Sequence, residues 1–136
     1  MLSIASYDTT YVDLARAKID AHVEAFDALK AQAGGAAALP ELETAYFNGL
    51  VMVLDHYFDH RSRYMELKDG NALNEVRILC NSFMHNDGRL AEDKQIRLDP
   101  RKSVLGLKPG DEIALTRDSF VKLADAFVTE IGKKYP

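Results

Sequence analysis

Hydrophobic side chains recur at steps of three and four residues along four stretches of the chain, which is the spacing of an amphipathic α-helix. These stretches run from Thr10 to Gln32, from Glu41 to Lys68, from Ala72 to His85 and from Asp118 to Lys134. The connections between the first three are short, which favours antiparallel neighbours. The pattern therefore predicts a bundle of four main helices.

Each predicted helix has one apolar stripe that we expect to face the core. In chain order the stripes are Val12, Ala15, Ile19, Val23, Phe26 and Leu29; Leu42, Tyr46, Leu50, Val53, Tyr57, His60 and Tyr64; Leu73, Val76, Cys80 and Phe83; and Phe120, Leu123, Phe127 and Ile131. Aromatic residues at helical spacing are most often core residues, so we assign those of the second stripe to packing rather than to stacking on a base.

The helical period disappears between Arg89 and Thr116. Two runs there, Gln95 to Asp99 and Glu112 to Thr116, alternate polar and apolar residues as strands do, and the turn Lys108 to Asp111 precedes the second run. The predicted fold class is therefore all-α: an antiparallel bundle of four main helices with a small β-like ribbon before the last helix.

Length, charge and cysteine content bound the class of protein. The chain has 136 residues, which predicts a single domain over residues 1–136, and its formal net charge of -4 gives no overall basic field to attract nucleic acid. Cys80 is the single cysteine, so no intrachain disulfide is expected. The start of the chain lacks the pattern of a secretory signal, and the most apolar run, residues 49–54, is too short to span a bilayer. We therefore expect a cytoplasmic protein with no membrane partner.

The third predicted helix carries a polar strip made of Arg77, Asn81 and His85. These residues are four apart, so successive members lie one helical turn above each other. The strip offers a cation, an amide and a titratable imidazole, which are groups that can act together on a phosphodiester. The sequence therefore predicts a candidate catalytic strip for which no cofactor is expected.

The segment Asn81 to Gly88, which reads NSFMHNDG, resembles the signature of the HEPN superfamily: an Arg, usually a following polar residue, and a His downstream. The resemblance implies a helical bundle that commonly dimerises. It further implies a metal-independent ribonuclease, or an RNA-binding relative, of a defence or toxin–antitoxin system, with a cognate partner protein as a further candidate. His85 matches the family His, and Asn81 matches the polar residue that follows the family Arg.

The chain departs from the family pattern at the arginine. Cys80 stands where the family has its Arg, and the nearest arginine, Arg77, has seven residues between it and His85 where the family usually has four to six. If the strip is active, we expect His85 to move a proton at the ribose 2′-hydroxyl or the leaving oxygen, Arg77 to offset phosphate charge and Asn81 to orient either partner. The departure predicts degraded catalysis.

Other interpretations of the same sequence stay open. Arg89, Arg97 and Arg101 make the segment after the strip locally basic and are candidate RNA-binding residues, although a solvated loop also explains charges this intermixed. The strip itself can be a plain polar surface on a non-enzymatic, dimerising interaction module.

A metal site is the third interpretation. His56 and His60 lie one turn apart, and His22 on a neighbouring helix is a conceivable third ligand. We favour a packing role for His60 and partial exposure for His56, since pairs of His are common on helices.

Overall fold

The computed structural model describes residues 9–34, 39–58, 72–92, 96 and 98–134. Within these residues the chain forms α-helices and one short 3-10 helix, η1. Their bounds are α1 (Thr9–Ala33), α2 (Leu39–Tyr57), α4 (Ala72–His85), η1 (Pro100–Lys102) and α5 (Arg117–Lys134). The all-α prediction is confirmed for the described part of the chain. The predicted end of the second helix, including His60 and Tyr64, lies outside the described residues.

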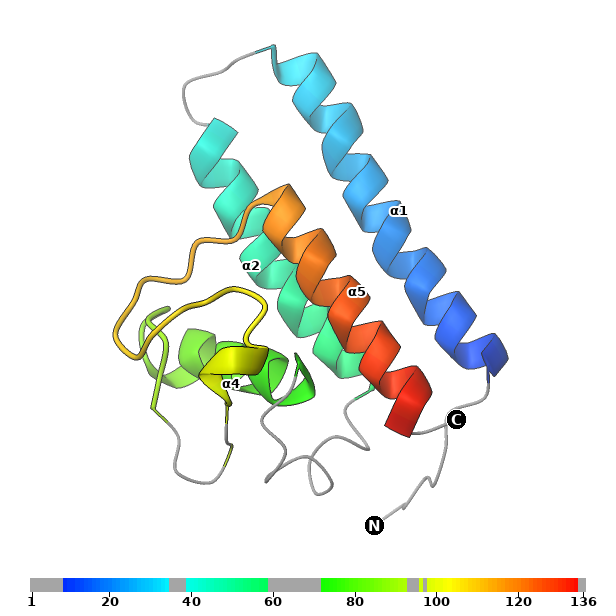
Figure 1. Cartoon of the computed structure of the whole chain (residues 1–136). Coiled ribbons are helices and arrows are strands. Elements are labelled where there is room, and N and C mark those ends of the chain that lie inside the picture. Colours follow the sequence, from blue (N-terminus) through cyan, green and yellow to red (C-terminus); the bar gives the residue numbers. More distant parts are fainter. Residues whose placement is uncertain (1–8, 35–38, 59–71, 93–95, 97, 135–136) are drawn as a thin grey trace.

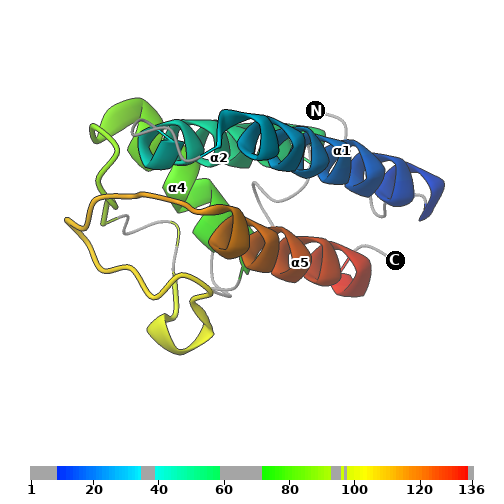
Figure 2. The same ribbon diagram turned by 90° about the horizontal axis from the view of Figure 1, so that it is seen from above.

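Three of the helices run alongside one another and the fourth crosses them. Figure 1 shows that α1 and α2 are antiparallel, whereas α2 and α5 run in the same direction. Seen from above, α1 and α2 form one layer over α5, and α4 lies across one end of them (Figure 2). The bundle is therefore antiparallel for α1 against its two neighbours but not throughout.

Aromatic rings join α1, α2 and α5 at the centre of the core. The rings of Phe26 and Phe47 meet edge to face with centroids 4.8 Å apart, and Phe47 lies 5.4 Å from Phe120. Further along, Phe58 packs against Phe127 at 5.5 Å. Such pairs contribute about 0.5–1.5 kcal/mol each beyond the apolar area that they bury.

The predicted core stripes are right for the last helix and nearly right for the first. Phe120, Leu123, Phe127 and Ile131 are all buried, and in α1 only the ends of the stripe differ: Val12 is partly buried and Leu29 is exposed. In α4 the stripe is buried apart from Phe83, which is partly buried, but the burial extends to nine of the 14 residues. This helix is enclosed on several sides.

The predicted stripe of α2 is right in part: Leu50 is buried and Tyr46 and Tyr57 are partly buried against the core, but the buried side is rotated about the helix axis from the predicted one. The buried residues are Phe47, Leu50, Val51 and Leu54, whereas Leu42 and Val53, which were expected in the core, are exposed. Residues 49–54 are almost uniformly apolar, so more than one stripe at helical spacing fits this part of the chain. Leu42 and Val53 belong to a second stripe that fits the same run, and in the structure these two side chains are exposed to solvent.

The predicted ribbon does not form between its two expected runs in the described residues. Glu112 instead makes an isolated antiparallel bridge with Arg89, and the Ile113 N–H donates to the Gly88 carbonyl oxygen at 2.9 Å. Beyond this bridge, the Asn48 side chain of α2 bonds to the backbone of the run from Glu112 to Thr116. Its amide donates to the Ile113 carbonyl oxygen, and its oxygen accepts from the Leu115 N–H. Gln95 and Arg97 of the other run lie outside the described residues.

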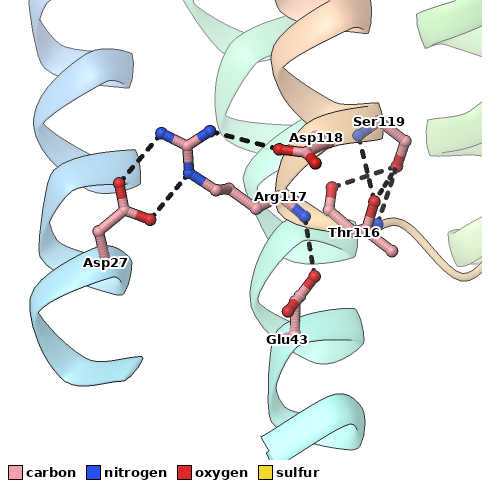
Figure 3. Close-up of polar contacts among 6 residues, drawn as sticks. All are labelled: Asp27, Glu43, Thr116, Arg117, Asp118 and Ser119. Atoms are coloured by element: carbon pink, nitrogen blue, oxygen red, sulfur yellow. Dashed lines mark hydrogen bonds and ion pairs between the residues drawn. The ribbon is translucent and has the colours of Figure 1, made fainter. Parts of the chain in front are cut away.

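A polar cluster fastens the start of α5 to the two longest helices (Figure 3). The Arg117 guanidinium donates to both carboxylate oxygens of Asp27 on α1, at 2.8 and 3.0 Å, and the Arg117 N–H donates to Glu43 on α2 at 3.0 Å. Thr116 and Ser119 bond reciprocally to each other's backbone N–H groups, which caps the helix.

Within the described residues, no helix combines the length and apolar character that crossing a bilayer requires.

Candidate functional site

The first half of α4 is an internal anchor rather than a site open to solvent. Glu75 is 1% exposed, and its carboxylate accepts from the Ser103 hydroxyl at 2.8 Å and from the Val104 and Leu105 N–H groups at 2.7 and 3.1 Å. A buried carboxylate is stable when donors surround it in this way. Sequence reasoning missed Glu75, because a glutamate in the first turn of a helix ordinarily indicates a solvated position.

The carboxyl end of α4 closes in a turn built on Ser82. The Ser82 carbonyl oxygen accepts from the Asn86 and Gly88 N–H groups at 3.0 and 3.1 Å, and its buried hydroxyl donates to Ile78 and accepts from the Ala91 N–H. Asp87 and Gly88 have φ values of 55° and 72°, a conformation that glycine adopts readily and aspartate tolerates. The turn therefore has a defined geometry at the predicted end of the helix.

The predicted strip becomes more exposed toward this turn. Arg77 and Asn81 are partly buried, whereas His85 is exposed at the last position of the helix. The strip therefore presents its imidazole at the surface.

Arg89 joins the end of the strip through the turn. Its N–H donates to the Asn86 carbonyl oxygen, and the Asn86 amide donates back to the Arg89 carbonyl oxygen at 2.7 Å, so the Arg89 backbone lies beside the residue that follows His85. The exposed guanidinium donates through one nitrogen to the Gly110 carbonyl oxygen at 3.2 Å. Because a guanidinium has five N–H donors, others remain to contact an anion.

Of the other two basic candidates, Arg101 differs from Arg89. Arg101 bonds to the carboxylate of Asp99 through its side chain and its backbone N–H, at 3.0–3.3 Å, and these bonds hold the pKa of Asp99 below its usual range. The positive charge of Arg101 is therefore already paired with the Asp99 carboxylate. Arg97 lies outside the described residues.

Cys80 lies on the core side of α4, at the position that corresponds to the family arginine. It is 7% exposed, and its thiol donates to the Val51 carbonyl oxygen at 3.9 Å. A side chain at this position faces α2 rather than solvent. The predicted buried role of Cys80 is confirmed.

The three histidines proposed as metal ligands do not all fall within the described residues. His22 and His56 are exposed on α1 and α2, and His60 lies outside the described residues. In the part of the chain that the structure describes, no group of three or more His, Cys, Asp or Glu residues could hold a metal ion.

A cavity of about 660 Å³ opens beside α4 and was not predicted from the sequence. It lies between Ile78 of α4, residues 90–92, 96 and 98, and the segment 100–109, and its described lining is mainly apolar, with Glu92, Ser103 and Lys108 as the polar exceptions. No residue of the strip lines this cavity, so the cavity and the strip are separate features.

Comparison with other proteins adds no further residue to the site. The chain matches no protein-family model, no curated protein and no solved structure. The functional proposal consequently depends on the strip, its turn and the resemblance in the segment from Asn81 to Gly88.

Proposed function

We propose that the chain is a HEPN-like, RNA-binding domain of a defence or toxin–antitoxin system, and that it contacts the RNA backbone at the carboxyl end of α4. The observation that carries the proposal is the placement of an exposed imidazole, His85, at the end of the polar strip, next in the chain to Asn86, whose amide bonds to the Arg89 backbone. An imidazole and a guanidinium at one end of a helix form a suitable site for a phosphodiester.

Within the proposal the residues have separate roles. His85 and Arg89 bind one phosphate, and Asn81 orients it through its amide. Arg77 lies eight residues before His85, about 12 Å along the helix axis, and side chains on a helix lean toward its amino end. One nitrogen of the Arg77 guanidinium, Nη1, is also buried, so the proposal does not place Arg77 on the phosphate that His85 binds.

Cleavage is expected to be slow, because Cys80 leaves no cation at the position of the family arginine. Its side chain is buried against α2, so an arginine is missing from the side of the helix where the family has it. His85 can still accept or donate a proton at the ribose 2′-hydroxyl, and this step requires no metal. RNA binding is thus the main activity in the proposal, and cleavage is secondary.

The test compares two exposed histidines for their effect on RNA. A fluorescein-labelled single-stranded RNA is titrated with the protein at low salt in the presence of a chelator, and anisotropy and gel analysis report binding and cleavage. His85→Ala is expected to weaken binding about tenfold, which corresponds to one charge-assisted hydrogen bond of about 1.4 kcal/mol. His22→Ala is the matched control, since His22 is exposed on α1 and only its backbone carbonyl accepts from Tyr46.

Two results would contradict the proposal. One is wild-type protein that binds no RNA at low salt, where phosphate contacts are strongest. The other is equal RNA affinity of the His85→Ala and His22→Ala proteins.

A further inference from the structure

The cavity beside α4 has a size and a lining that suit an uncharged ring. Its volume of about 660 Å³ falls within the roughly 300–1,000 Å³ of ligand pockets. Ile78 and Leu90, two residues of its wall, are buried. The Ser103 hydroxyl in the lining is already engaged, because it donates to Glu75 and accepts from the Gly106 N–H at 2.9 Å. An anion inside this cavity would therefore lose its hydration with little in exchange.

Two chain segments connect this cavity to the phosphate site proposed at the end of α4. Arg89 directly precedes Leu90, which lines the cavity. The Arg89 guanidinium donates to the Gly110 carbonyl oxygen at 3.2 Å, and Gly110 directly follows the lining residue Pro109. The Leu90 N–H and carbonyl oxygen bond in turn to Asp111 and Gly110, both at 2.8 Å. The guanidinium therefore contacts a residue adjacent in the chain to the cavity wall.

Helix geometry places His85 on the side of α4 that borders the cavity. Ile78 and His85 are seven residues apart, which is nearly two helical turns, so they lie on the same side of α4 about 10 Å apart along its axis. Side chains on a helix lean toward its amino end, and this direction leads from His85 toward Ile78. A nucleotide with its phosphate at His85 and Arg89 can therefore extend its base toward the cavity.

A second cavity, of about 510 Å³, lacks these connections. It borders Ala72, the first residue of α4, which lies about 20 Å along the helix axis from His85. Its described lining includes two carboxylates, Asp125 and Glu130, against one cation, Lys102. This excess of negative charge disfavours a phosphodiester nearby. The larger cavity is therefore the one suited to a nucleotide bound at the end of α4.

We propose that the larger cavity binds one unstacked base of the RNA whose phosphate contacts His85 and Arg89. The inference rests on the proposed RNA binding and assigns a place to the base of the same nucleotide. Single-stranded RNA offers such bases, because they are not held in a duplex and can be splayed out. Glu92 and Lys108, the exposed charged residues of the lining, offer an acceptor and a donor to the hydrogen-bonding edge of the base.

The first test follows the surroundings of a single base. Emission from 2-aminopurine is quenched when this base stacks on its neighbours, and the described lining of the cavity has no aromatic side chain to quench it instead. A 5′-phosphorylated trinucleotide with 2-aminopurine between two adenines is titrated with the protein at low salt, and calorimetry reports binding independently. The emission is expected to rise as the complex forms, because the base leaves its stack for the cavity.

The second test fills the cavity. Ala91 lines it and is partly buried, so Ala91→Phe places a ring in the space proposed for the base. This variant is expected to abolish the rise in emission and to weaken RNA binding about tenfold, which is the order of effect of losing one base contact. Ala21→Phe, the same substitution at an exposed position of α1, is the matched control and is expected to behave as wild type. Circular dichroism checks that both proteins are folded.

The outcomes separate this inference from the proposed function. Wild-type protein that binds no RNA would overturn both. RNA that binds with no rise in emission, or with equal affinity for the Ala91→Phe and Ala21→Phe proteins, would overturn the base site and leave the proposed phosphate contacts standing. If Ala91→Phe does not fold, the emission of the wild-type complex decides alone.

Discussion

Glu75 and Arg117 both hold the last connection of the chain against the helices, but from different environments. Glu75 is buried and receives three hydrogen bonds from the segment 103–105, whereas the side chains of Arg117 and Asp27 are 39% and 42% exposed. Hydrogen bonds to a buried charge contribute strongly, because their loss leaves donors or acceptors without water. Similar numbers of polar contacts are therefore expected to have unequal effects on stability.

The same comparison bears on the candidate site. His85 and Glu75 lie on the same helix, α4, but His85 is exposed at its end whereas Glu75 is buried. If burial decides the contribution of a polar group to stability, His85 contributes little to the fold. Its side chain is then available to a ligand, which is the central claim of the functional proposal.

The largest expected effect is that of removing the buried anchor. Glu75→Ala leaves the Ser103 hydroxyl and two backbone N–H groups without their acceptor, and we expect it to lower the free energy of unfolding by about 3 kcal/mol. Urea denaturation followed by circular dichroism measures the change. Glu41→Ala, in the first turn of α2, is the matched control and is expected to change stability by about 0.5 kcal/mol or less. Equal effects of the two substitutions would contradict the comparison.

A smaller effect, dependent on pH, is expected at the exposed anchor. The hydrogen bonds from Arg117 lower the pKa of Asp27. A carboxylate with a lowered folded-state pKa stabilises the fold above its unfolded pKa of about 3.9, and this contribution is lost as pH falls through the folded-state pKa. Asp27→Asn is therefore expected to be slightly less stable than wild type at neutral pH and to approach it at strongly acidic pH.

Thermal unfolding of both proteins between neutral and acidic pH checks this prediction. Added salt is expected to reduce the difference at neutral pH, because both side chains are partly exposed and the pair is screened. A stability difference that grows as the pH falls would show that the sign is wrong.

The parts of the fold that sequence could predict were those with strong local signals. The carboxyl end of α4 was predicted at His85 because the segment from Asn86 to Gly88 favours a left-handed turn that stops a helix. The stripe of α5 was predicted because polar residues separate its apolar positions clearly. In both cases neighbouring residues in the sequence supply the information.

Sequence failed where the partner of a residue is distant in the chain. The apolar run of α2 fits several stripes, and only packing against α1, α4 and α5 selects Phe47 and Leu54 for the core. The pairing of Arg89 with Glu112 joins segments that share no local signal. Glu75 was missed for the same reason, since its donors follow it by about 30 residues.

The candidate strip was found from the sequence, whereas its connection to Arg89 needed the structure. Spacing alone placed Arg77, Asn81 and His85 on one strip of a helix. The turn on Ser82 that brings the Arg89 backbone next to Asn86 depends on two consecutive left-handed residues and on a buried hydroxyl. Such a turn is not specified by residue spacing.

The most direct measurement of the central claim follows the histidine side chains by NMR as RNA is added. The chain has four His, so few imidazole signals are expected, and the His85→Ala protein assigns the one that disappears. We predict that the His85 signal shifts on titration with single-stranded RNA while those of His22 and His56 stay in place, and that His85→Ala unfolds within about 0.5 kcal/mol of wild type. An unmoved His85 signal in the presence of bound RNA would contradict the account.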